Sequence, residues 1–364
     1  MRGLASSGVM SMGGDVHVLL EHSNRGKKSI GIDLTTPRGI EVVYKLAATC
    51  DVFLTNKLPA VRKKLQVEID DIRAQNPNII YVAGTGGGER GPDADRGGYD
   101  FLSYWCRAGS AMGATPPDAT GLVGQPGPGY GDSIGGMTIA GGIMGALFHR
   151  ERTGEAISVD VSLLGVGLWA MSPAVALSLQ MNNAWRPPAS GSGSGGPSNP
   201  LVGVYRTQDD RFVALSCLQG FHYWPGACKA IGREDLIADE RFTSHELLAI
   251  NAGAAREILA SVFASAPLAD WRERLAAFNG QWSIAQDSLE VVDDPQVVAN
   301  GYMGETVNAA GIPFRLVTVP VQFDGVAAAP HRAPEFNEHC DEILESIDYD
   351  AETVLELKIE GVVA

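Results

Sequence analysis

The segment NIIYVAGTGGG, residues 78–88, places an apolar strand directly before a turn of glycines. Two further apolar runs, at residues 29–34 and 51–55, precede it in the chain. Residues with helical spacing separate these runs, beginning with a helix that Pro37 opens. Strands that alternate with helices are typical of a parallel sheet, because each crossover between parallel strands needs a helix. We therefore predict an α/β fold for the first part of the chain.

Beyond this region we expect a helix over residues 137–148 that is packed on both sides, a strand at 156–161 and one apolar helix from about 163 to 179. A stretch rich in proline, serine and glycine follows at residues 187–197 and indicates a loop or linker. After it come a strand pair at 202–207 and 211–217, amphipathic helices between 224 and 278, a helix opened by residues 294–296 and a strand-rich return after Phe314. These boundaries predict a large domain (1–189), a smaller α+β domain (190–304) and a C-terminal return to the large domain (305–364).

The composition excludes several classes of protein. The formal net charge is −15, which disfavours nucleic acid and anionic membranes as partners. No apolar run is long enough for a transmembrane helix. The five cysteines are widely spaced, and neither they nor the seven histidines form a metal-binding pattern, so we expect free buried thiols, no metal and a cytoplasmic location.

Three features of the first half could bind or transform a ligand. The glycine turn at 84–88 resembles a dinucleotide fingerprint, but Glu89 stands where a glycine is required, so a tight turn is the stronger interpretation. Arg25 and Lys27 flank a glycine and are candidates for phosphate contacts, whereas Lys63 and Lys64 fit a solvated helix face. Asp132 lies among glycines just before an apolar helix. It is either the N-cap of that helix or a nucleophile with space cleared around it.

From Asn24 onward the chain resembles family III CoA transferases, whose relatives include the α-methylacyl-CoA racemases. The matching segments occur in the family's order: NRGKKS (24–29) with DL (33–34), DV (51–52) with TN (55–56), NPNIIY (76–81), GP (91–92), GGYD (97–100), GD (131–132), RTG (152–154) with VDVSLL (159–164), and DPQ (294–296).

This resemblance implies a Rossmann-like large domain, an interlocked homodimer and transfer of coenzyme A (CoA) from an acyl-CoA thioester to a carboxylic acid. It implies that Asp132 is the nucleophile, through an aspartyl anhydride and an aspartyl-CoA thioester. CoA would be a substrate, with no tightly bound cofactor. The implied CoA contacts are Arg25, Lys27, Asn56, Gly86, Gly87 and Tyr99. The glycine-rich residues 190–196 correspond to the family's mobile active-site loop.

Two alternatives stay open from the sequence. A racemase needs a base on each side of the α-carbon, and this chain has Tyr99 where the racemases have a histidine; tyrosine, with an ordinary pKa of about 10, is a poor base at neutral pH. A non-catalytic CoA-binding subunit is the second alternative, because residues 1–21 are too short for the strand, turn and helix that usually open the family's fold.

The chain also departs from the family at residues 57–60, which replace the family's Arg-Pro-Gly turn. An acyl pocket could be lined by Trp105, Trp169 or Trp185, and we expect an acceptor larger than formate.

Overall fold

The computed structural model describes Gly3 and residues 11–189 and 198–364. The chain divides into two compact units. Unit 1 comprises Met1–Met112, Gly124–Asn183 and Val292–Ala364, and unit 2 comprises Gly113–Val123 and Ala184–Val291. The predicted glycine-rich loop, residues 190–196, lies outside the described residues.

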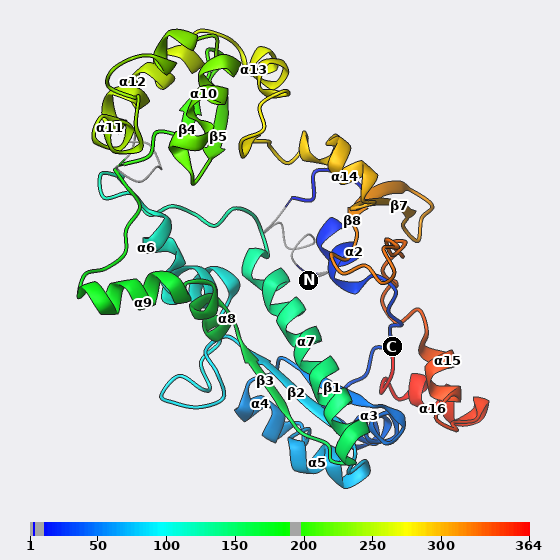
Figure 1. The fold of residues 1–364 in the computed structure, drawn as a ribbon. Helices are drawn as coiled ribbons and strands as arrows, with labels where there is room; N and C mark the ends of the chain where they lie inside the picture. Colours follow the sequence, from blue (N-terminus) through cyan, green and yellow to red (C-terminus); the bar gives the residue numbers. More distant parts are fainter. Residues whose placement is uncertain (1–2, 4–10, 190–197) are drawn as a thin grey trace. The chain divides into compact units, whose positions relative to one another are not determined.

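A three-stranded parallel sheet forms the centre of unit 1 (Figure 1). Its strands are β1 (Val52–Thr55), β2 (Ile80–Thr85) and β3 (Val159–Ser162), in the order β1-β2-β3. The predicted mixed α/β fold with a parallel sheet is thus confirmed. The helices between β1 and β2 are α4 (Pro59–Lys64) and α5 (Ile69–Gln75), and α3 (Pro37–Thr49) precedes β1.

The long helix α7 (Tyr130–Thr153) packs along the sheet against β2 and β3 (Figure 1). It begins seven residues earlier than the sequence suggested, because Gly129 takes a left-handed conformation (φ 68°) that turns the chain into the helix. The expectation that it is packed on both sides is wrong for the single chain. Met144 and Phe148 on its outer face are 60% and 68% exposed.

Two other sequence predictions in unit 1 need correction. Residues 29–34 do not form a strand; only Ile32 makes an isolated bridge, to Val363, because hydrogen bonds to the C-terminal region hold the segment instead. The helix predicted from 163 to 179 is broken into α8 (Leu163–Ala170) and α9 (Ser172–Met181), which differ in direction by 66°. Pro173 explains the break, because its ring is incompatible with a continuous helix.

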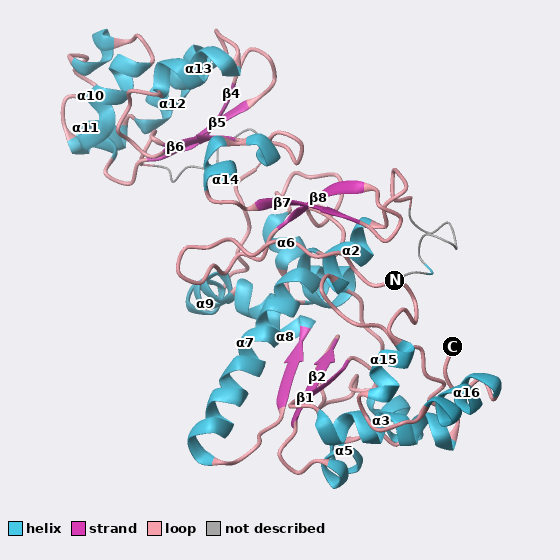
Figure 2. Ribbon diagram, turned by 90° about the vertical axis from the view of Figure 1, so that its right-hand side faces the viewer, coloured by secondary structure: helices cyan, strands magenta, loops and turns pink. Residues whose placement is uncertain are grey.

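The C-terminal part of unit 1 adds a small antiparallel pair and two short helices (Figure 2). The pair is β7 (Met303–Val307) with β8 (Pro313–Val317), and the helices are α15 (Cys340–Glu345) and α16 (Ala351–Ile359). Leu344 and Leu357 of these helices share a buried cluster with Val42 of α3, so the two C-terminal helices pack against α3. The remaining elements of this unit are α2 (Val18–Asn24), the π-helix η1 (Phe101–Arg107) and α14 (Pro295–Ala299); η3 (Val291–Asp293) and α6 (Ser110–Ala114) lie at the unit boundaries.

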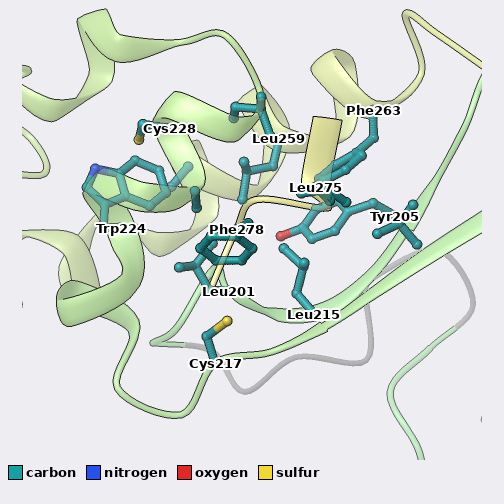
Figure 3. Close-up of a cluster of buried hydrophobic side chains, with 14 of the residues drawn as sticks. Leu201, Tyr205, Leu215, Cys217, Trp224, Cys228, Leu259, Phe263, Leu275 and Phe278 are labelled. Carbon is teal, nitrogen blue, oxygen red and sulfur yellow. The ribbon is translucent and has the colours of Figure 1, made fainter. Parts of the chain in front are cut away.

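Unit 2 is a three-stranded antiparallel sheet covered by helices. Its strands are β4 (Val202–Arg206), β5 (Phe212–Ser216) and β6 (Trp282–Ile284), and its helices are α10 (Gly220–Ala230), η2 (Glu234–Ile237), α11 (His245–Ile250), α12 (Ala252–Phe263) and α13 (Leu268–Leu275). Figure 3 shows its core, in which Trp224, Phe263 and Leu275 are almost completely buried. Unit 2 therefore has its own hydrophobic core.

Among the described residues no single helix has the length and composition to cross a membrane; the bent pair α8 and α9 passes that test only when taken together. All five cysteines are free. Cys217, Cys228 and Cys340 are buried as expected, whereas Cys50 is exposed.

Candidate active site

Asp132 lies in the first turn of α7, as the third residue of that helix. It is not the N-cap, which is Gly129. The capping acceptor comes instead from another segment: the Gly131 backbone N–H donates to Asp100 Oδ1 at 3.0 Å. Asp100 is buried, and its second oxygen accepts a hydrogen bond from Gln125 Nε2 at 3.2 Å. Within the described part of the chain the exposed Asp132 carboxylate has neither a hydrogen-bond donor nor an ion-pair partner. The interpretation of Asp132 as a helix cap is therefore wrong.

The position of α7 places Asp132 beyond the carboxyl end of the parallel sheet. Gly142 of α7 lies against Val159, the first residue of β3, and Gly135 lies against Leu163, directly after that strand ends. Asp132 is one turn further toward the N-terminus of the helix. Ligands of open α/β sheets bind in the crevice at this edge.

The electrostatic surroundings of Asp132 work against its negative charge. The pKa of Asp132 is raised above its ordinary value, first by partial desolvation and then by repulsion from the Asp100 carboxylate. A carboxylate that is poorly solvated and unpaired is a stronger nucleophile than one held by donors. The backbone N–H groups of Tyr130 and Asp132 also donate no hydrogen bond among the described residues, as is usual in the first turn of a helix.

Close packing explains why a glycine precedes Asp132. A Cβ at Gly131 would overlap the ring of Tyr104 and lie 2.5 Å from Asp100 Oδ1. Glycine thus allows the helix terminus to approach the segment from Tyr99 to Tyr104. That segment continues into the π-helix η1, a structure that the sequence analysis did not anticipate.

Three of the predicted CoA contacts directly follow strand ends, and a fourth, Tyr99, precedes Asp100. Asn56 is exposed directly after β1, and Gly86 and Gly87 form the turn after β2. Gly86 is buried, and a Cβ there would lie 2.7 Å from Gly98 Cα, so glycine at this position allows two chain segments to approach closely. Gly87 has open space around it. Tyr99 is 80% exposed and precedes Asp100, which connects it to the α7 terminus.

The two predicted basic contacts already have partners elsewhere in unit 1. Arg25 Nη1 donates to the Val317 carbonyl of β8 at 2.6 Å, and its Nε donates to the His22 carbonyl at 3.0 Å. Lys27 Nζ donates to the Ser23 carbonyl at 2.9 Å and to Asn24 Oδ1 at 3.2 Å. Their contact with CoA stays a prediction.

Glu89, which follows the glycine turn, takes part in an ion pair with Arg62 that the sequence analysis did not anticipate. The buried Arg62 contacts Glu89 Oε2 at 2.5 Å and Glu68 Oε1 at 3.0 Å. Its guanidinium is shared between these two carboxylates, so Glu89 is held in an ion pair and repels a phosphate at the turn less than a free carboxylate would. Nothing in the sequence pattern distinguished Arg62 from its exposed neighbours Lys63 and Lys64, because only the fold buries one of the three.

Two cavities adjoin the turn at Gly87. One, of about 480 Å³, is lined by Glu89, Asp160 and Trp169 among others, and the second, of about 350 Å³, is lined by residues of the 93–107 segment. Of the three tryptophans considered for an acyl pocket, Trp169 lines the larger cavity and is 80% exposed. Trp105 is a buried core residue, and Trp185 belongs to unit 2.

A family model described as CoA-transferase family III matches residues 3–340. The chain is 27% identical to the (R)-2-hydroxy-4-methylpentanoate CoA-transferase of Clostridioides difficile, over 99% of this chain and 90% of that protein. It is 31% identical to a probable fatty acyl-CoA transferase of Mycobacterium tuberculosis, over 80% of this chain and 76% of that protein. The crystal structure of a CaiB/BaiF family protein from Brucella suis superposes with a TM-score of 0.77 at 26% identity, covering 93% of this chain and 86% of that one.

Proposed function

The chain belongs to CoA-transferase family III and is a CoA-transferase, and we propose that Asp132 carries the CoA group between its two substrates. The observation that carries this proposal is the exposed, unpaired carboxylate at the α7 terminus, whose capping role Asp100 has taken over. A residue needed only for the helix would make the capping bond itself.

The proposed reaction begins when an Asp132 oxygen attacks the thioester carbonyl carbon of the donor. The C–S bond breaks, and CoA leaves as a thiolate from a mixed anhydride. The thiolate then attacks the Asp132 carbonyl carbon, which releases the donor acid and forms an aspartyl-CoA thioester. The acceptor carboxylate displaces the thiolate from Asp132 to give a second anhydride. In the last step the thiolate attacks the acceptor's carbonyl carbon, and this restores the Asp132 carboxylate.

Each step passes through a tetrahedral oxyanion. The unused backbone N–H groups at the start of α7 are suitable donors for that charge, aided by the positive end of the helix dipole. We propose Asn56, Gly86, Gly87 and Tyr99 as the surface that holds CoA beside Asp132. Arg25 and Lys27 are proposed as outer phosphate contacts that exchange an intrachain acceptor for the ligand. The acceptor is proposed to be a carboxylic acid larger than formate.

We also propose that the protein works as a homodimer in the cytoplasm, interlocked as in the family. The support for the dimer is a set of large apolar side chains on α7, α8 and α9 that are at least two-fifths exposed: Tyr130 41%, Met137 43%, Met144 60%, Phe148 68%, Leu168 49%, Trp169 80%, Leu177 43%, Leu179 79% and Met181 54%. Exposed apolar surface of this kind is typical of an interface. Light scattering after gel filtration would test it, and a monomer at micromolar concentration would contradict it.

The experiment for the proposed chemistry is trapping with hydroxylamine. Incubation with an acyl-CoA donor and hydroxylamine should convert Asp132 to its hydroxamate, which peptide mass spectrometry locates. The Asp132→Asn variant is the control for labelling at other carboxylates. An unmodified Asp132 during donor turnover would contradict the proposed nucleophile.

A further inference from the structure

The smaller cavity beside Gly87 has a composition that the proposed chemistry at Asp132 does not use. It encloses about 350 Å³ and is lined by Gly87, Asp93, Arg96, Gly97, Gly98, Leu102, Ser103 and Arg107. Two of its eight lining residues are arginines, in a chain whose formal net charge is −15. Such a concentration of positive charge needs a local reason.

The arginines are only partly neutralised by their neighbours. Arg107 Nη1 lies 2.8 Å from Asp93 Oδ2, and Arg96 Nη1 lies 3.9 Å from Asp93 Oδ1. One carboxylate therefore serves two guanidinium groups. The two other nearby acids are engaged elsewhere: Glu89 with Arg62, and Asp95 with the backbone N–H of Ala60 at 2.9 Å. The charged residues that line the cavity, two arginines and one aspartate, therefore carry a net positive charge.

The remaining polar groups of the cavity add hydrogen-bond donors. The backbone N–H groups of Gly87, Gly97 and Gly98 donate no hydrogen bond within the described residues. Ser103 is 6% exposed, and its hydroxyl, which lies against Gly98, has no hydrogen-bond partner in the same part of the chain. The lining therefore offers more hydrogen-bond donors than acceptors, which is the composition of a site for anionic oxygens.

We propose that Arg96 and Arg107, together with the N–H groups of Gly97 and Gly98, bind a phosphate group of CoA. The proposal rests on the proposed function, since CoA is the phosphate-bearing substrate of that reaction. Arginine forks match the oxygens of phosphate in two-point contacts. Two forks, three N–H groups and a hydroxyl exceed what the two oxygens of a carboxylate can accept. The ribose phosphate of CoA offers three terminal oxygens and up to two charges, and its pyrophosphate offers four non-bridging oxygens and two charges.

Binding of CoA to variants, measured by calorimetry without any acyl group, tests this site independently of the chemistry at Asp132. Arg96→Ala and Arg107→Gln are each expected to weaken CoA binding about tenfold, the typical loss for one charge-assisted contact. Arg206→Ala is the matched control, because Arg206 is an exposed arginine of unit 2 that also pairs with an aspartate, at 3.0 Å from Asp210. Its CoA affinity should stay at the wild-type value.

Asp93→Asn removes the acid that competes for both arginines, so it should tighten CoA binding about threefold. A gain in affinity cannot result from misfolding. This variant therefore tests the site even if the reduced CoA affinity of Arg96→Ala or Arg107→Gln were due to a folding defect.

Dephospho-CoA, which lacks the phosphate on the ribose, distinguishes the two phosphate positions. A loss confined to CoA assigns the site to the ribose phosphate, and an equal loss for both ligands assigns it to the pyrophosphate. Unchanged CoA affinity in both arginine variants would overturn the proposal. So would a rise confined to the KM of the acceptor, which would assign the site to a carboxylate. Hydroxamate formation at Asp132 in the same variants shows separately whether the proposed function holds.

Discussion

The sequence predicted a role in substrate binding or catalysis both for Asp132 at the α7 terminus and for the basic segment at residues 24–28. The two regions differ in whether their charged side chains already have partners within the fold. At the terminus the Asp132 carboxylate has no partner among the described residues, while Asp100 supplies the structural hydrogen bond. In the basic segment Arg25 bonds to β8, and Lys28 contacts Glu342 at 2.5 Å. A side chain whose bonding capacity is spent within the fold has less to offer a ligand. The difference separates residues that act on substrate from residues that hold the chain together.

The strongest test of this difference is the Asp132→Asn substitution. The amide has the same shape but cannot form an anhydride, so CoA transfer should fall by at least about 10³-fold. Because the side chain bonds to nothing in the described fold, the melting temperature should stay near that of the wild type. Residual activity within tenfold of the wild type would place the nucleophile elsewhere.

Gly131→Ala breaks the arrangement from the structural side. The new Cβ would lie 2.5 Å from Asp100 Oδ1 and overlap Tyr104, so the free energy of unfolding should fall by about 1–3 kcal/mol. Activity should fall as well, because the helix terminus must move. Gly253→Ala in α12 is the control, since a Cβ there meets nothing within 4 Å; its stability should be unchanged or up to about 1 kcal/mol higher. Equal denaturation midpoints for the two variants would contradict the close approach.

Asp100→Asn separates the charge of Asp100 from its capping role. The amide oxygen can still accept from the Gly131 N–H, although the NH2 group cannot replace the oxygen that accepts from Gln125 Nε2, and the repulsion that helps raise the pKa of Asp132 is gone. Asp132 must be ionised to attack, so activity is lost as pH falls through its pKa. Removing one raising cause lowers that pKa and moves the acid limb of the kcat/KM profile to lower pH. An acid limb that stays in place or moves upward would contradict this coupling.

Arg25→Ala probes the second region and should have the smallest effect. A phosphate contact by Arg25 must replace its bond to the Val317 carbonyl, so little net affinity is gained. We expect the KM for acyl-CoA to rise only about two- to threefold. A tenfold rise would show that the segment opens to bind CoA, and the comparison between the two regions would then be wrong.

The alternation of strands and helices predicted the parallel sheet, because the apolar runs of β1 and β2 and the helical spacing of α3 are visible in the sequence. The apolar run at residues 29–34 was wrongly predicted as a strand. The break between α8 and α9 was missed although Pro173 marks it, since the apolar run continues on both sides. The start of α7 was missed because Gly131, Gly135 and Gly136 hide the helical pattern.

The candidate site was only half visible in the sequence. Asp132 could be located by its glycine neighbours and by the family resemblance. Asp100 could not be assigned its role, because 30 residues separate it from Gly131 and only the fold brings the two together. Arg96 and Arg107 escaped notice for a similar reason: their spacing forms no motif, and the cavity that they line depends on the approach of Gly98 to Gly86.

The most direct measurement of the central claim uses an acceptor acid labelled with heavy oxygen in its carboxylate. In the proposed sequence an acceptor oxygen bridges to Asp132 in the second anhydride and stays on Asp132 when the thiolate attacks the acceptor carbon. After turnover, peptide mass spectrometry should therefore find the label in the Asp132 carboxylate. Turnover that leaves the Asp132 peptide unlabelled, or that labels another carboxylate instead, would contradict the account.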